Sequence, residues 1–318
     1  MAKIGYFLSS EEHSAPNLVQ FAVAAEEAGF QGLWISDHFH PWNDAQGQSP
    51  FVWSTIGALA QATKRMSVTT AVTCPTIRIH PAIIAQAAAT CASLLPERFS
   101  LGVGTGEALN EHILGDRWPP LGTRMEMLEE AIEVIRTLWS GDTVTHHGAH
   151  YTVENARIYS LPKALPPILV SGFGPVAARL AGRVGEGFCC VKPDRELVAA
   201  FEEAGGAGKR KQGGLKVCWG ADEAEAKRTA HRLWPNDVLP GQMAQELSMP
   251  AHFEQASAIV TETMVADQVV CGNDVDRHVD AIQKYLDAGF DEVYVGQIGT
   301  EQQGFFDFYR SEVLPRFR

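Results

Sequence analysis

The chain has 318 residues, of which 45% are hydrophobic, and it carries a formal net charge of −12. One α/β barrel of roughly 250 residues with insertions fits this length, and we place a single domain over 1–318. The negative charge argues against nucleic acid and anionic membranes as partners, and no apolar run of ~18 residues predicts a membrane-spanning helix. The chain starts in a strand-like run without the regions of a signal peptide, so we expect a cytoplasmic protein.

Strand-like apolar runs alternate with helix-like segments along the chain. We predict strands at 3–8, 33–36, 66–72, 99–103, 168–171, 187–191, 215–220 and 292–296. We predict helices at 16–28, 51–63, 81–95, 121–139, 175–184, 194–204, 222–233, 274–288 and 305–314. This order requires parallel strands with crossover helices. Because eight such strands are present and no G-x-G-x-x-G follows the first, a (β/α)8 TIM barrel is favoured over an open doubly wound sheet.

Three segments depart from this alternation. Residues 143–160 alternate like a β-hairpin, with Gly148 near the turn. Residues 234–268 contain three prolines and predict an insertion with short helices before the last crossover helix. Insertions of this kind lie over the C-terminal face of a barrel, where active sites form. The glycine-rich residues 205–214 predict a surface loop.

The cysteines and the paired histidines predict no metal site. None of the six cysteines belongs to a C-x-x-C pair, and most lie in apolar patterns, so we expect buried free thiols. His146 and His147 are neighbours on a predicted strand and therefore point to opposite sides.

Polar and titratable residues gather where the predicted strands end. In a barrel these ends meet at one face. The residues concerned are Glu11, Glu12, His13, Asp37, His38, His40, Trp42, Thr73, Cys74, Thr76, Gly104, Thr105, Gly106, Glu107, Asn110, Ser171, Gly172, Phe173, Gly174, Lys192 and Asp194.

Three of these side chains suit hydride transfer to or from an alcohol carbon. His38 can remove a hydroxyl proton at neutral pH, although a structural histidine that caps the loop is an equal alternative. Glu107 can give a proton to a ring nitrogen of a planar ligand, or it is simply a carboxylate favoured at a helix start. Trp42 can stabilise a cationic intermediate, or it is an ordinary core tryptophan.

A glycine-containing turn follows the fifth predicted strand. Ser171, Gly172, Phe173 and Gly174 lie between this strand and a helix that begins with Pro175. Free N–H groups at such a helix start can hold a phosphate. Glycines also close ordinary strand-to-helix turns, so the signal is weak by itself.

Longer blocks of sequence carry a family resemblance. The stretches at 36–42, 102–111 and 181–188 read SDHFHPW, GVGTGEALNE and AGRVGEGF. With these blocks the chain resembles the luciferase-like deazaflavin-dependent oxidoreductases, closest to the coenzyme F420-dependent glucose-6-phosphate dehydrogenase group. The resemblance implies a bacterial-luciferase-like barrel, a homodimer, and hydride transfer between C5 of F420 and a hydroxyl or carbonyl carbon of a small-molecule substrate.

The same resemblance implies roles for single residues. The catalytic set is His38 as base, Glu107 as the acid that protonates the deazaflavin, Trp42, and Glu11 beside it. The cofactor contacts are Asp37, Ala71, Val72, Cys74, Thr105, Gly106, Glu107, Asn110, Ser171, Gly172, Phe173 and Gly174. A cis peptide bond is implied between Ala71 and Val72. For the anionic cofactor tail, candidate cations are Arg78, Arg179 and Arg183.

The substrate-anchoring segments depart from the family. Sugar-phosphate members have Thr-Ser-Gly-Lys after the sixth strand, where this chain has Val191-Lys192-Pro193-Asp194. A lysine before the last crossover helix is replaced within Val265-Ala266-Asp267-Gln268. We therefore predict an alcohol or sugar-like substrate without the usual phosphate clamp. The alternatives are a sugar-6-phosphate dehydrogenase with a rebuilt phosphate site, an FMN-dependent monooxygenase, and a deazaflavin-binding carrier.

Overall fold

A computed structural model describes residues 2–317 of the chain. Eight parallel strands form a closed ring in the order β1-β2-β3-β4-β7-β8-β9-β11, and β11 pairs back with β1. The strands are β1 (Lys3–Leu8), β2 (Gly32–Ile35), β3 (Ser67–Thr70), β4 (Phe99–Val103), β7 (Ile168–Ser171), β8 (Gly187–Cys190), β9 (Arg210–Cys218) and β11 (Glu292–Gln297). The predicted (β/α)8 barrel is confirmed.

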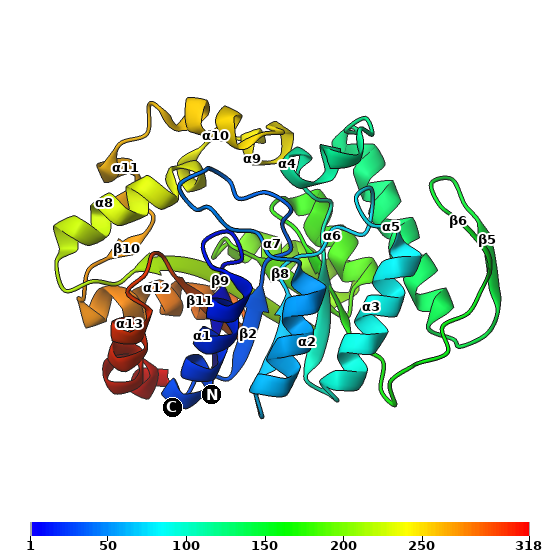
Figure 1. Cartoon of the computed structure of the whole chain (residues 1–318), viewed down its shortest axis with the longest axis horizontal. Coiled ribbons are helices and arrows are strands. Elements are labelled where there is room, and N and C mark those ends of the chain that lie inside the picture. Colours follow the sequence, from blue (N-terminus) through cyan, green and yellow to red (C-terminus); the bar gives the residue numbers. More distant parts are fainter. Residues whose placement is uncertain (1, 318) are drawn as a thin grey trace.

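Helices surround this ring and pack on it through one apolar face each (Figure 1). They are α1 (Ala15–Ala28), α2 (Val52–Ala62), α3 (Pro81–Leu94), α5 (Leu121–Leu138), α6 (Pro175–Val184), α7 (Arg195–Phe201), α8 (Glu223–Leu233), α12 (Val275–Ala288) and α13 (Gln302–Phe308). In α12 the buried residues His278, Ile282 and Tyr285 follow the helical period. This helix begins at Asp274, which accepts two backbone N–H bonds, and ends at Gly289 in the left-handed conformation.

Large side chains fill the inside of the barrel below its C-terminal face. Trp34 of β2 stacks on Tyr294 of β11 with ring centroids 4.9 Å apart. Phe7, Leu169 and Cys189 complete this layer. The barrel is therefore packed and not a pore, and any site for a ligand lies above these residues.

Strand β9 begins earlier than the glycine-rich sequence predicts. The expected surface loop at 205–214 is wrong for its second half, which belongs to β9. A Cβ on Gly213 would lie 2.4 Å from Tyr285, and one on Gly214 would lie 2.2 Å from Trp34. These glycines are thus required by tight packing on both sides of a strand rather than by a turn.

Two insertions extend from the barrel. Strands β5 (Val144–His147) and β6 (Thr152–Ala156) pair antiparallel as a hairpin beside α5. Residues 234–268, here called the cover segment, run across the C-terminal ends of the strands (Figure 1). The cover segment contains a 3-10 helix (Pro235–Val238), α9 (Met243–Glu246), α10 (Pro250–Ser257) and α11 (Glu262–Ala266), and is followed by β10 (Val270–Cys271). Two short elements that we did not predict, α4 (Ala108–Glu111) and a 3-10 helix (His112–Leu114), follow β4.

Three expectations from the composition concern the cysteines, membrane-spanning helices and metal sites. All six cysteines are free and buried, as predicted. Among residues 2–317, no helix combines the length and the apolar character that crossing a membrane requires. No group of three or more His, Cys, Asp or Glu in this range is arranged to hold a metal ion.

Candidate active site

His38 and Glu11 form the centre of the strand-end cluster. His38 follows β2 and Glu11 follows β1, which are neighbours in the ring. The Nε2 atom of His38 lies 3.5 Å from Oε1 of Glu11. Their side chains are only 9% and 3% exposed, so this pair is shielded from bulk water.

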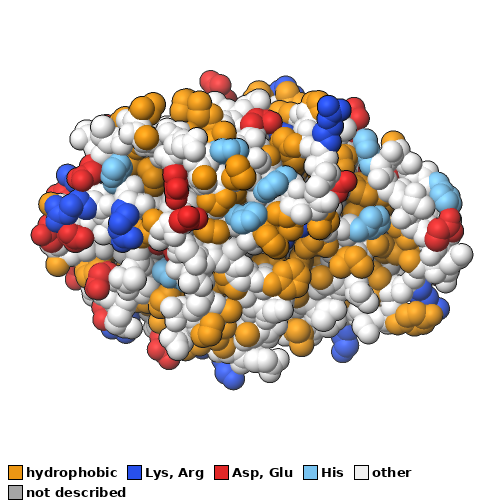
Figure 2. Space-filling view, turned by 45° about the horizontal axis from the view of Figure 1, so that its top comes forward, with side chains coloured by type: hydrophobic (Ala, Val, Ile, Leu, Met, Phe, Trp, Pro, Cys, Tyr) orange, Lys and Arg blue, Asp and Glu red, His pale blue; other side chains and the backbone are white. Residues whose placement is uncertain are grey.

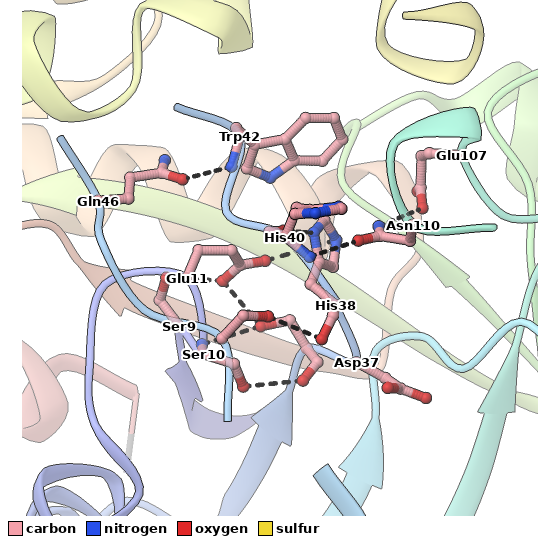
Figure 3. Close-up of polar contacts among 12 residues, drawn as sticks. Ser9, Ser10, Glu11, Asp37, His38, His40, Trp42, Gln46, Glu107 and Asn110 are labelled. Carbon is pink, nitrogen blue, oxygen red and sulfur yellow. Dashed lines mark hydrogen bonds and ion pairs between the residues drawn. The ribbon is translucent and has the colours of Figure 1, made fainter. Parts of the chain in front are cut away.

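Two hydroxyl groups fix the other oxygen of Glu11. Ser9 Oγ donates to Glu11 Oε2 at 2.9 Å, and Ser36 Oγ donates to the same atom at 2.8 Å (Figure 3). These two bonds fix the orientation of the carboxyl group, so that its other oxygen, Oε1, points at His38.

The second ring nitrogen of His38 determines what the first can do. Nδ1 of His38 lies 3.2 Å from the backbone carbonyl oxygen of His40, which only accepts. A proton on Nδ1 satisfies this contact and leaves Nε2 with a lone pair. When Nε2 then takes a proton, Glu11 stabilises the imidazolium across the 3.5 Å gap. The geometry is that of a base with a supporting carboxylate.

Trp42 lies above His38, and the cover segment holds it from the other side. The two ring centroids are 5.0 Å apart. The backbone N–H of Trp42 donates to Gln46 Oε1 at 2.8 Å (Figure 3). Phe253 of α10 packs edge-on against Trp42 with centroids 5.1 Å apart. An apolar wall therefore borders the base on the side of the cover segment.

Asp37, Arg78 and Glu111 form a buried ionic network next to His38. Arg78 Nη2 donates to Asp37 Oδ1 at 2.9 Å, and Arg78 also binds Glu111 through its backbone N–H and Nε. Thr73 Oγ1 donates to the other oxygen of Asp37 at 2.8 Å. Burial raises the pKa of Glu111, although Arg78 opposes this shift. Burial also acts to lower the pKa of Arg78, but the carboxylates of Asp37 and Glu111 outweigh it, so the pKa of Arg78 is raised. Both oxygens of Asp37 are thus engaged, which makes it an orienting residue for the loop that carries His38.

Glu107 begins the short helix α4 across the site from Glu11 (Figure 3). Asn110 Nδ2 lies 3.4 Å from Glu107 Oε2. The Asn110 Oδ1 atom accepts from the backbone N–H groups of Phe39 and His40 at 2.9 and 3.2 Å. Asn110 therefore ties the carboxylate after β4 to the loop that carries His38.

The strand ends between these groups are closely packed after β3 and β4, and they leave an open corner after β7. The peptide bond between Ala71 and Val72 is cis, as the resemblance implies. Gly106 has a φ of +75°, and a Cβ there would lie 2.5 Å from Cys74 Sγ. A Cβ on Gly174, at the start of α6, would meet nothing within 4 Å. The first turn of α6 leaves backbone N–H groups without intrahelical partners, so this open corner can receive an anion.

The three arginines predicted to contact an anionic cofactor tail differ in how far their charges are already paired within the protein. Arg78 is 6% exposed and bound to two carboxylates, so its charge is already used in the protein. Arg183 lies 3.6 Å from Glu129 in an exposed pair, and Arg179 is exposed on the same helix. The structure therefore disfavours Arg78 for this role.

The structure brings the predicted site residues to one face and adds others. The residues after β1, β2, β3, β4 and β7 lie at the same end of the barrel. Our prediction did not include Gln46, Phe253 or Lys216. Gln46 and Phe253 give no sequence signal, because their contact with Trp42 depends on the path of the loop and of the cover segment. Lys216 is a cation within the otherwise apolar run that predicts a strand at 215–220, and that pattern was a usable signal.

With this geometry established, the relationship to known proteins is clear. Residues 1–292 match the family described as luciferase-like monooxygenase. The chain belongs to this luciferase-like family. The individual relatives are more specific than this family description.

Curated relatives cover essentially the whole chain. A protein of Microbacterium testaceum, named F420-dependent glucose-6-phosphate dehydrogenase, is 35% identical over 99% of this chain and 97% of its own length. Proteins with the same name from Beutenbergia cavernae and Mycobacterium tuberculosis are 36% and 34% identical.

Solved structures give the same architecture. An F420-dependent secondary alcohol dehydrogenase in complex with an F420-acetone adduct superposes with a TM-score of 0.93 at 29% identity, over 100% of this luciferase-like chain and 99% of that one. The F420-dependent tetrahydromethanopterin reductase of Methanopyrus kandleri has a TM-score of 0.78 at 20% identity, which shows the fold alone.

Proposed function

We propose that this protein is a coenzyme F420-dependent oxidoreductase that acts on a hydroxyl or carbonyl carbon. The observation that carries the proposal is the shielded base, His38 with Glu11, at the same end of the barrel as Glu107 and the open helix start after β7. Full-length relatives named as F420-dependent dehydrogenases support the same cofactor. When bound, F420 supplies a hydride donor or acceptor at C5 of its deazaflavin.

The residues after β3, β4 and β7 fit a planar ring with an anionic tail. Gly104 and Gly106 let the chain after β4 pack closely on the chain after β3, because a Cβ at these positions would lie 2.8 Å from Val72 and 2.5 Å from Cys74. Gly172, Phe173 and Gly174 lead to the free N–H groups at the start of α6, which would hold a phosphate. Cys74 is buried, with Sγ 2.9 Å from Thr76 Oγ1, so it shapes the wall and presents no reactive thiolate. Burial raises the pKa of this thiol well above its usual value.

Four residues would carry the chemistry, and two of them, His38 and Glu107, would move protons. His38 takes the hydroxyl proton at Nε2 in the oxidation direction, and Glu11 stabilises the resulting imidazolium. Trp42 excludes water from the reacting carbon and presents its ring face to developing positive charge. Glu107 holds a proton on a carboxylate oxygen and gives it up on the opposite side of the site. Reduction of a carbonyl reverses these steps.

The substrate that we propose is an alcohol or sugar-like molecule. The second candidate is a sugar 6-phosphate held by a rebuilt phosphate site, because curated relatives at about 35% identity are named for glucose 6-phosphate. Asp194 caps α7, where its Oδ1 accepts from the backbone N–H groups of Glu196 and Leu197, and its negative charge remains. Lys192 is exposed after β8.

A cofactor titration tests the proposal first. The purified protein is titrated with F420 and with FMN, and then mixed with oxidised F420 and a panel of secondary alcohols, sugars and sugar phosphates. We expect saturable F420 binding and loss of its visible absorbance with at least one alcohol. Tight FMN binding without F420 binding would instead support an oxygen-dependent monooxygenase.

Replacement of the base separates an enzyme from a cofactor carrier. His38→Ala should lower kcat by about 10²- to 10⁴-fold, the usual contribution of a positioned base, with little change in F420 affinity. The control is His147→Ala, since His147 is 63% exposed on the hairpin and pairs only with Glu154. F420 binding that is the same in His38→Ala and the wild type, without turnover by either protein, would favour the carrier alternative.

The location and assembly of the protein are further parts of the proposal. A cytoplasmic location is supported by composition, and a homodimer by the resemblance to dimeric family members. Size-exclusion chromatography with light scattering measures the assembly directly, and a monomeric mass would contradict the dimer.

A further inference from the structure

Four basic residues lie on the barrel strands, and one of them is at the catalytic end. Lys3 and Arg210 pair with Glu292 at the opposite end of the barrel. Lys211 pairs with carboxylates outside the ring. Lys216, near the end of β9, is thus the one cation that the strands carry toward the C-terminal face.

Alternation along β9 directs Lys216 into the mouth of the barrel. Gln212 accepts from Trp34 Nε1 inside the ring, and Gly214 packs against the same indole. Residues two apart on a strand share a face. Lys216 is therefore on the inner face, one step above this layer, and it is in register with Gly296 of β11.

The cover segment neutralises this lysine. Lys216 Nζ lies 3.0 Å from Oδ2 and 3.4 Å from Oδ1 of Asp237. It also lies 3.9 Å from the ring centroid of Trp234. The side chains of Lys216 and Asp237 are 19% and 26% exposed, so the pair is accessible to a small molecule in the mouth.

No other cation comes from the segment above the mouth. The sequence has no Lys or Arg between Arg232 and Arg277, whereas the cover segment carries five acidic residues. Those acids are Asp237, Glu246, Glu254, Glu262 and Asp267. Figure 2 shows hydrophobic side chains and histidines over the middle of this face, with Lys and Arg mainly at its margins.

We propose that Asp237 determines substrate specificity by neutralising Lys216, so that the mouth accepts an uncharged alcohol and rejects an anionic substrate such as a sugar phosphate. This inference rests on the proposed function and selects the substrate class at the same site. A phosphate dianion that approached Lys216 would have to displace the Asp237 carboxylate and then lie beside it, which like-charge repulsion opposes. A neutral hydroxyl group meets no such repulsion.

The test removes the charge of Asp237 and keeps its shape. Asp237→Asn leaves Lys216 without its ion-pair partner. Binding of inorganic phosphate to the cofactor-free protein, measured by calorimetry at low salt, should then tighten about tenfold or more, the order expected when one neighbouring charge is lost. With F420 present, the KM for glucose 6-phosphate should fall by a similar factor, while kcat/KM for an uncharged secondary alcohol stays within about threefold of the wild type.

Three further variants make the result specific. Glu262→Gln removes one charge from the exposed start of α11 in the same cover segment, and it should leave phosphate binding at the wild-type level. The double variant Asp237→Asn with Lys216→Met should abolish the gain. Asp237→Ser provides a second removal of the charge if the Asn variant does not fold.

The outcomes separate the inference from the proposed function. Unchanged phosphate binding and an unchanged KM in both Asp237 variants would overturn the inference. A wild-type protein that uses glucose 6-phosphate more efficiently than every uncharged alcohol would overturn it as well, and would leave the F420 function intact. Failure of the wild type to bind F420 would defeat the proposed function, whereas the phosphate measurement on the cofactor-free protein still tests the ion pair.

Discussion

The two sides of the C-terminal face are held together in different ways. On the side of β1 to β4, the ionic residues are almost fully buried: the side chains of Arg78, Asp37 and Glu111 are 6%, 1% and 1% exposed. On the side of β9 and the cover segment, the ion pairs reach solvent. The side chains of Lys216 and Asp237 are 19% and 26% exposed, and Glu246 of the cover segment, which binds Arg124 of α5, is 48% exposed.

This difference in burial agrees with the roles that we propose, catalysis on the first side and substrate selection on the second. Buried groups with two or three partners tolerate little change, because removal of one partner leaves the others unsatisfied. Partly exposed pairs contribute little stability and can be exchanged at small cost. The proposed base lies among the first kind, and the residues that we propose to select the substrate lie among the second.

The largest effect should come from breaking the buried network. Arg78→Met leaves the carboxylates of Asp37 and Glu111 without their shared cation, and should lower the free energy of unfolding by ~3–5 kcal/mol. Urea denaturation measures this loss. Arg228→Ala is the control, since that arginine forms an exposed pair with Glu225. A loss below ~1 kcal/mol for Arg78→Met would contradict the contrast between the two sides.

An intermediate, pH-dependent effect is expected at Glu12, which joins the two sides. Its carboxylate accepts from Trp234 Nε1 at 2.6 Å and from the Gly299 N–H at 2.7 Å. Burial raises the pKa of Glu12 to about 7, against the opposing effect of these two hydrogen bonds. Because the folded pKa exceeds the unfolded one, stability from this group is complete below pH ~4.5 and is lost as the pH rises to ~7.

Glu12→Gln should remove that pH dependence. Relative to the wild type, the variant should gain up to ~3 kcal/mol in free energy of unfolding between pH ~4.5 and ~7, with a constant offset for the altered hydrogen bonds. Burial lowers the pKa of the neighbouring His13 to about 4. His13 titrates in both proteins, so its contribution cancels in the difference. Parallel pH profiles of variant and wild type would show that Glu12 is ionised with an ordinary pKa.

The smallest effect is expected for the attachment of α9. Glu246→Gln weakens an ion pair whose acid is half exposed, and should change the global free energy of unfolding by less than ~1 kcal/mol. Hydrogen exchange in residues 243–246 should nevertheless become faster, because Arg124 then holds α9 less tightly. If global stability fell as far as in Arg78→Met, the cover segment would be as firmly integrated as the catalytic side.

The sequence by itself predicted the barrel fold and the residues that lie at the C-terminal face of the barrel. The periodicity of each helix and strand is local, and parallel strands place their C-terminal ends together, so the positions of His38, Glu11 and Glu107 followed from the order of elements. The same local reasoning placed 205–214 partly wrongly, because glycines in a tightly packed strand look like glycines in a loop. The resemblance supplied the roles of these residues, which remain predictions.

Only the tertiary structure decided which side chains are partners. Arg78 meets Asp37 and Glu111, Trp42 meets Phe253, and Lys216 meets Asp237, in each case between different elements of the fold. No local pattern specifies such pairs, because they depend on how loops cross the barrel mouth and on which charges are already compensated. That compensation separates Arg78, a cation used for stability, from Lys216, a cation held at the site where we propose that the substrate binds.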